Sequence, residues 1–325
     1  MCPAGVDEVN EIQFLGRDRC PVCGRGGKEI SRAPFSKPPI STYLEKHYPL
    51  QGGITPVWFG EVDFVLDECE SCGLVYQRMI PNDSLMKKLY EEWVDPESSL
   101  HSTRRAWPVE YFSNLAREMN LLIRHFGTTP GALDLFDFGM GWGDWCLMAK
   151  AYGCSVVGHE ISQPLIDHAR ASGIRTLKWE DIPEHRFDVI NLDQVLEHVS
   201  DPRRIVEYLR GSLKPNGLMN IRVPDGQDIR RRLRIGDWNA PKGTRNSLNP
   251  VAPVEHINCF TRSSMLKMAE LIGLVPLKLR AWSPPDRRIL DCTVRDVLLP
   301  FYRSYVKVKT GQNPWSTSIY FRKAG

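Results

Sequence analysis

The chain of 325 residues lacks the features that mark membrane, secreted and disordered proteins. Its first residues contain neither a basic segment nor an apolar stretch of the kind found in a secretory signal. Its apolar runs have the length of strands, well short of the roughly 20 residues that cross a bilayer. Hydrophobic residues make up 42% of the chain and charged residues 25%, as in globular proteins. We therefore expect a cytoplasmic protein without membrane contact.

A strong excess of either charge is also missing. The 42 Lys and Arg residues against 39 Asp and Glu residues give a net charge of +3. Proteins that bind nucleic acid through their overall charge carry a larger basic excess. We expect no nucleic-acid partner, while the oligomeric state is left open. The length allows one large domain with a smaller one beside it, or two domains.

The nine cysteines cannot all pair in disulfides, because their number is odd. Four of them form two Cys-x-x-Cys pairs, each followed by glycine: Cys20, Cys23, Cys69 and Cys72. This pattern is typical of a zinc ribbon, in which four thiolates complete a closed tetrahedral site with a structural role. Two unrelated thiol pairs or a redox dithiol remain the alternatives. We predict a structural Zn²⁺ at these four cysteines.

From about residue 129 onward, predicted strands alternate with predicted helices. The strands cover 133–138, 155–159, 187–192 and 218–223, and the helices cover 145–152, 163–171 and 202–213. Such alternation predicts an α/β fold with a doubly wound, Rossmann-like parallel sheet. We expect a zinc-binding domain at 1–95, a linker and helix at 96–128, and a core at 129–325 with an insertion at 225–260.

A glycine-rich turn follows the first strand of the core, with glycines at positions 139, 141 and 143. Glycine lets the backbone turn sharply and approach a ligand closely. The second strand ends at Glu160, where a carboxylate can accept hydrogen bonds from ribose hydroxyls. Together these residues predict a cofactor that contains a nucleoside. The Gly-x-Gly-x-Gly spacing favours S-adenosylmethionine over a nicotinamide dinucleotide without deciding between them.

These motifs resemble those of the class I S-adenosylmethionine-dependent methyltransferases. Residues 135–143 are similar to the family's first motif, 187–202 to the "LEH" segment of its small-molecule branch, and 213–218 to the turn before its fifth strand. The resemblance implies that Asp137 orders the turn, that the glycines hold the methionine part of the cofactor, and that Glu160 binds the ribose. It further implies three cofactor-binding positions: Asp181, Asp193 and Gln194.

A cysteine-rich segment ahead of such a core resembles the sugar-nucleotide C-methyltransferases of deoxysugar pathways. Glu255-His256 is similar to their Glu-His motif, which implies that His256 acts as the base beside Glu255. His198 is a second candidate base. The expected function is O- or C-methylation of a sugar, a sugar nucleotide or a natural-product intermediate. An RNA methyltransferase with a zinc ribbon and an inactive cofactor-binding module remain the alternatives.

Overall fold

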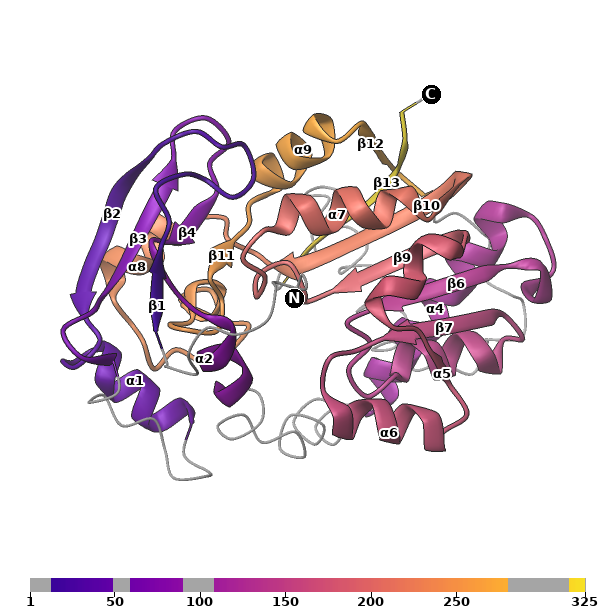
Figure 1. Cartoon of the computed structure of the whole chain (residues 1–325), viewed down its shortest axis with the longest axis horizontal. Coiled ribbons are helices and arrows are strands. Elements are labelled where there is room, and N and C mark those ends of the chain that lie inside the picture. Colours follow the sequence, from indigo (N-terminus) through magenta and orange to yellow (C-terminus); the bar gives the residue numbers. More distant parts are fainter. Residues whose placement is uncertain (1–12, 49–58, 90–107, 280–315, 325) are drawn as a thin grey trace, which may run out of the picture.

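The computed structural model describes residues 13–48, 59–89, 108–279 and 316–324. Within these residues the chain forms a small N-terminal sheet and a larger α/β core, which lie side by side in Figure 1. The sequence also predicts a helix at 294–306, and this segment lies outside the described residues, as do Cys2 and Cys292. No helix of the described residues is long and apolar enough to span a membrane.

The core is built on a seven-stranded sheet with the order β12-β13-β10-β9-β6-β7-β8. Its strands are β6 (Asp134–Phe138), β7 (Ser155–His159), β8 (Arg175–Thr176), β9 (Phe187–Asp193), β10 (Leu213–Pro224), β12 (Leu274–Leu277) and β13 (Ser316–Lys323). Strands β8, β7, β6, β9 and β10 pair in parallel, whereas β13 runs antiparallel to both of its neighbours. The doubly wound sheet is thus confirmed. The reversed strand differs from the all-parallel expectation, because residue periodicity carries no information about strand direction.

Helices cover both faces of this sheet. They are α4 (Pro108–Phe126), α5 (Asp144–Ala151), α6 (Gln163–Ala171), α7 (Pro202–Gly211) and α9 (Arg262–Leu271), with short 3-10 turns η3 (Pro130–Ala132) and η4 (Trp179–Glu184). Apolar residues of α7 and α9 pack on one face, and those of α4, α5 and α6 pack on the other. Helix α7 begins with Pro202 in its first turn, and the Asp201 side chain accepts a hydrogen bond from the Arg204 backbone amide at 3.0 Å.

The N-terminal sheet has the order β11-β4-β3-β2. It contains β2 (Gly27–Pro34), β3 (Asp63–Cys69), β4 (Val75–Gln77) and β11 (Asn258–Cys259), beside the pair β1 (Phe14–Gly16) and β5 (Met79–Pro81) and the helices α1 (Ile40–His47) and α2 (Asp83–Lys88). Strand β11 comes from the far end of the predicted insertion and pairs antiparallel with β4. The insertion therefore completes the sheet of the N-terminal segment.

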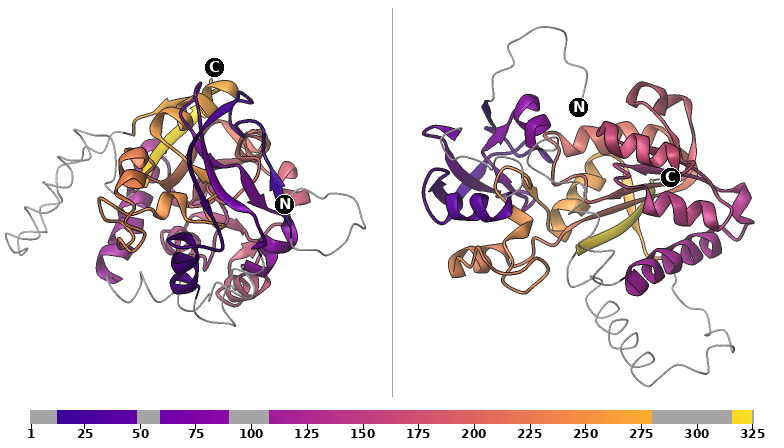
Figure 2. Two further views of the ribbon diagram at one scale, coloured as in Figure 1. Left: turned by 90° about the vertical axis from the view of Figure 1, so that its left-hand side faces the viewer. Right: turned by 90° about the horizontal axis from the view of Figure 1, so that it is seen from below.

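The rest of the insertion packs on the same sheet. Helix α8 (Ile229–Ile235) and the turn η5 (Asn249–Val251) share an apolar cluster with Phe35, Phe64 and Leu85 of the N-terminal segment. Both views in Figure 2 show this orange segment against the purple strands. The predicted domain boundaries at 95 and 128 remain a prediction. What the structure shows is that segments distant in sequence share one core.

Candidate active site

The glycine turn joins β6 to α5 at the carboxyl edge of the sheet, and its three glycines have different surroundings. All three have positive φ angles, of 73° at Gly139, 53° at Gly141 and 78° at Gly143. A Cβ at Gly139 would lie 2.6 Å from Val195 Cγ2, and one at Gly143 would lie 2.5 Å from Ile174 Cδ1. A Cβ at Gly141 would meet no atom of the described residues within 4 Å. Gly139 and Gly143 therefore allow close packing, and Gly141 alone faces open space where a ligand can approach.

Glu160 lies directly beside this open position. Its Oε2 accepts a hydrogen bond from the Gly141 amide at 3.0 Å. Its Oε1 accepts from the amides of Ile161 at 2.8 Å and Ser162 at 3.1 Å. Glu160, the residue predicted to bind the ribose, thus lies in direct contact with the predicted glycine turn. The carboxylate is held at the end of β7, on the edge where open α/β sheets bind their ligands.

Asp137 lies beneath the turn rather than on its surface. Its side chain is buried and accepts from Asn191 Nδ2 at 2.8 Å, and Asn191 Oδ1 in turn accepts from Asn220 Nδ2 at 2.8 Å. Burial raises the pKa of Asp137 to about 7. The residue therefore links β6 to β9 and β10 below the turn, which fits the ordering role that the sequence predicts for it.

The other predicted cofactor residues lie along the same edge. Asp193 ends β9 and pairs with Arg222 Nη1 at 2.6 Å. Gln194 follows with a φ of 58°, and its amide donates to Arg222 O at 2.8 Å. Asp181 lies on η4, which follows β8, with a half-buried side chain. Beside it the rings of Trp179 and Tyr208 stack with their centroids 4.1 Å apart.

The two predicted histidines come together with two glutamates at the end of β9. The rings of His198 and His256 meet edge to face with centroids 4.8 Å apart. His198 Nε2 lies 3.9 Å from Glu197 Oε1, and His256 Nε2 lies 3.9 Å from Glu255 Oε1. Glu255 also accepts a hydrogen bond from the hydroxyl of Tyr48 at 3.2 Å. Two segments separated in sequence thus form one cluster, which we call the Glu-His cluster: Glu197, His198, Glu255 and His256.

Backbone carbonyls fix the tautomer of both histidines. His198 Nδ1 lies 3.0 Å from Glu255 O, and His256 Nδ1 is hydrogen-bonded to Asn249 O. A carbonyl can only accept, so Nδ1 donates in each ring and Nε2 carries the lone pair. Burial lowers the pKa of His198 and lowers that of His256 to about 3. Both rings are therefore neutral near pH 7.

The two glutamates have opposite protonation states. Burial raises the pKa of Glu197 well above its usual range, and neither of its carboxylate oxygens has a hydrogen-bond partner among the described residues. Burial also acts to raise the pKa of Glu255, but the hydrogen bond from His47 and the coupling to His256, His198 and Lys242 outweigh burial and lower this pKa. Burial thus favours the protonated, neutral form of Glu197, whereas the surroundings of Glu255 favour its ionised form.

The N-terminal segment holds the loops that carry this cluster. Arg17 donates to Gln77 O and Ile257 O, each at 2.7 Å, and to Asn258 Oδ1 at 2.9 Å. Gln77 Nε2 donates to Ala252 O and His256 O, each at 3.0 Å. Asn258 Nδ2 donates to the carbonyls that flank Glu197-His198, at 2.9 Å to Leu196 and 2.7 Å to Val199. Sequence reasoning missed these positioning residues, because no spacing in the chain links Arg17 or Gln77 to a loop near residue 256.

The four predicted zinc ligands also come together. Their Sγ atoms all lie within 4.8 Å of one another, with Cys20–Cys72 at 3.5 Å and Cys23–Cys69 at 3.3 Å. Zn–S bonds of about 2.3 Å would place tetrahedral sulfurs roughly 3.8 Å apart. The two knuckles have the same backbone turn, since Gly24 N donates to Cys20 O and Gly73 N to Cys69 O, both at 2.9 Å. The donor set and its geometry fit a zinc ion.

The fold and the edge site together define a class of protein. A parallel sheet with one reversed strand carries a glycine turn after its first core strand and an acid after its second, as in the class I S-adenosylmethionine-dependent methyltransferases. Residues 111–279, slightly more than half of the chain, match the family described as "Methyltransferase domain". The chain belongs to this family. The methyltransferase family and the doubly wound α/β core expected from the sequence are thus confirmed.

Comparison with individual proteins gives more distant likenesses. A ubiquinone biosynthesis O-methyltransferase of Bradyrhizobium diazoefficiens is 32% identical over 146 residues, 41% of this chain and 57% of that protein. The chain thus spans little more than half of that relative's length. A protein of the same name from Coxiella burnetii is 26% identical over 206 residues, 57% of this chain and 81% of that protein. Among solved structures, the plantazolicin methyltransferase BamL covers 70% of this chain and 90% of its own, at 15% identity and a TM-score of 0.46.

Proposed function

We propose that this protein transfers a methyl group from S-adenosylmethionine to a hydroxyl group of a small molecule. Its family is that of methyltransferase domains, and the two relatives above are named O-methyltransferases. The observation that carries the proposal is the position of two features on one sheet edge. The open glycine turn follows β6 and its acid follows β7, while two neutral histidines meet near the end of β9. A sugar, a sugar nucleotide or a natural-product intermediate is the proposed acceptor class.

The glycine turn and its neighbours are the proposed cofactor site. Gly141 offers an open backbone, Glu160 offers carboxylate oxygens for ribose hydroxyls, and Asp181 lies on the turn expected beside the adenine. Asp193 and Gln194 complete the edge at the end of β9. When bound, S-adenosylmethionine supplies a methyl group that is already activated. The protein's main contribution is then to align the acceptor and to remove its proton.

We assign the base function to the histidine pair, with His198 nearest to the acceptor. The side chain of His198 is 20% exposed, whereas that of His256 is 3% exposed. His198 Nε2 carries a lone pair at neutral pH, so it can accept the proton that a hydroxyl group gives up. The ionised carboxylate of Glu255 lies close enough to stabilise the imidazolium that results. The ring of His256 then packs against the ring of His198 and holds it in position.

The four clustered cysteines are proposed to hold a structural Zn²⁺. Four thiolates would leave no open coordination position, so the metal would take no part in the reaction. The amides of Val22 and Cys23 point to Cys20 Sγ, and those of Ser71 and Cys72 point to Cys69 Sγ. Such N–H donors stabilise thiolates in both knuckles alike.

Transfer of a radiolabelled methyl group tests the proposed reaction. The full chain is incubated with labelled S-adenosylmethionine and separate pools of sugar, sugar-nucleotide, phenolic and RNA acceptors. We expect label in a small molecule that contains a hydroxyl group, and a loss of about 10²–10⁴-fold in turnover for His198→Ala with little change in cofactor binding. Label in RNA alone, or unchanged turnover in both His198→Ala and His256→Ala, would contradict the proposal.

A further inference from the structure

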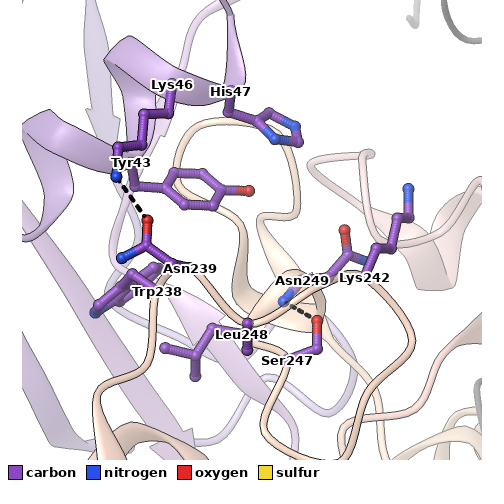
Figure 3. A pocket seen from close by; sticks show the side chains of 10 residues that line it. Tyr43, Lys46, His47, Trp238, Asn239, Lys242, Ser247, Leu248 and Asn249 are labelled. Atoms are coloured by element: carbon purple, nitrogen blue, oxygen red, sulfur yellow. Dashed lines mark hydrogen bonds between the residues drawn. The ribbon is translucent and has the colours of Figure 1, made fainter.

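A pocket of about 220 Å³ opens between α1 and the insertion. Figure 3 shows Tyr43, Lys46 and His47 of α1 on one side, with Trp238 and Lys242 of the insertion across from them. The floor contains Leu248 and Ser247, which are buried. Lys46 Nζ donates a hydrogen bond to Asn239 Oδ1 at 3.0 Å across the opening, and this bond connects the two walls of the pocket.

The lining is both aromatic and positively charged. Tyr43 stacks on His47 at 5.0 Å and meets the edge of Trp238 at 5.5 Å. Lys46, His47 and Lys242 supply nitrogen donors, and none of the ten described residues that line the pocket is acidic. Aromatic faces pack against planar or apolar rings, and the ammonium groups of lysines bind anions as point charges. The pocket therefore suits a ring or chain that carries a negative group.

Two residues of the pocket wall contact the Glu-His cluster, and a third, Lys242, acts on it through its charge. His47 Nε2 lies 3.5 Å from Glu255 Oε2. The carbonyl of Asn249 accepts the hydrogen bond that fixes His256. The charge of Lys242 acts on all four members of the cluster. The pocket and the proposed base are thus parts of one continuous site.

We propose that this pocket binds an anionic group of the methyl acceptor, a carboxylate or a phosphate, through Lys46 and Lys242. The inference rests on the proposed function, because it specifies the acceptor of that same site. The volume lies below the roughly 300 Å³ at which pockets begin to enclose a whole ligand. The pocket therefore holds the charged end of the acceptor, and the hydroxyl end extends toward the Glu-His cluster.

None of the four arginines of α8 lines this pocket, and three of them have other partners. Arg230 pairs with Glu68, Arg231 donates to Arg245 O at 2.8 Å, and Arg232 donates to Ser247 O at 3.3 Å. Arg231 and Arg232 thus hold the loop that forms the pocket floor. Lys46 and Lys242, at the rim, are therefore the lysines available to bind an anion in the pocket.

Binding of three probes to the full chain tests this proposal: 4-hydroxybenzoate, phenyl phosphate and neutral phenol, measured by ligand-observed NMR. The double variant Lys46→Ala/Lys242→Ala is compared with Lys28→Ala/Lys278→Ala, which removes two exposed lysines outside the pocket. We expect at least one anionic probe to bind more tightly than phenol. The pocket variant should weaken that binding by about tenfold or more, as for a lost charge-assisted hydrogen bond, and the control variant should not.

The carboxylate and phosphate arms show which anion the pocket prefers. Equal binding of phenol and both anions, no binding of either anion up to millimolar concentration, or equal loss in both double variants would overturn the proposal. Binding of S-adenosylmethionine is measured on the same samples. Cofactor binding without anion binding would refute the pocket while leaving the proposed function intact. Absence of cofactor binding would instead refute the proposed function.

Discussion

At the scale of single residues, the properties of the site follow from burial and from carbonyl partners. Burial lowers the pKa values of His198 and His256, and each Nδ1 donates a hydrogen bond to a backbone carbonyl. Both side chains are therefore neutral bases. Glu197 is held as a neutral acid by the same burial that makes an unpaired charge costly. The sequence predicts the histidines through their motifs. It does not predict Glu197 as a site residue, because only the fold shows that the side chain is enclosed.

The lowered pKa of His198 predicts the pH dependence of turnover. A base must be unprotonated, so turnover is lost as pH falls through the pKa of the base in the folded protein. Because that pKa is lowered in the free protein, the acid limb of kcat/KM should lie below about pH 6.5, the usual value for histidine. A pH profile of kcat/KM checks this. An acid limb above pH 7, or one that persists unchanged in His198→Ala, would contradict the assignment.

At the scale of elements, the strand–turn–helix units place the cofactor residues, and these units are what the sequence predicts best. Strand β7 and helix α6 have the predicted bounds, since Gly and polar residues mark their ends clearly. Strand β11 was not predicted, because its two residues carry no periodicity. Its pairing with β4 depends on contacts between distant segments, such as those of Arg17, that a single sequence does not encode.

The three glycines of the turn should respond differently to alanine. Gly139→Ala places a methyl group 2.6 Å from Val195 at a positive φ, so we expect a loss of roughly 1–3 kcal/mol in the free energy of unfolding. Gly141→Ala meets no steric contact and should cost less stability, but it should weaken cofactor binding more. Urea unfolding and calorimetry on both variants check this. Wild-type affinity for S-adenosylmethionine in Gly141→Ala would contradict the open-face assignment.

Arg17 should act on turnover through the loop that carries His256. Arg17→Lys retains the charge but loses the fork that reaches Gln77, Ile257 and Asn258 together. We expect lower kcat and a reduced free energy of unfolding with little change in affinity for S-adenosylmethionine. Arg19→Lys, an exposed neighbour, is the matched control. Equal kcat in the two variants would show that Arg17 does not position the loop.

At the scale of the whole molecule, the N-terminal segment and the core are joined by the insertion. Residues of α8 and η5 share an apolar cluster with the N-terminal sheet, and β11 extends that sheet. The Glu-His cluster lies where these parts meet, with Tyr48 and His47 reaching Glu255 from the N-terminal side. The two Cys-x-x-Cys pairs predict the metal ligands from spacing alone. They do not predict that the same segment lines the proposed acceptor pocket, because that depends on how the two sheets pack.

The proposed zinc should therefore support the site as well as the N-terminal fold. Metal analysis of freshly purified protein should find one zinc per chain, and Cys23→Ser should lower both the zinc content and the thermal midpoint. Cys154→Ser, a buried cysteine outside the cluster, should keep its zinc. Equal zinc content in the two variants, or protein without zinc, would refute the assignment of these four thiolates.

The most direct test of the account is calorimetric titration of the full chain with S-adenosylmethionine and with NAD. The account predicts one-to-one binding of S-adenosylmethionine. Glu160→Ala should weaken that binding by about tenfold or more, because the lost carboxylate would accept from ribose hydroxyls. Glu184→Ala, an exposed acid at the end of η4, should bind as the wild type does. Binding of NAD without binding of S-adenosylmethionine would contradict the central claim.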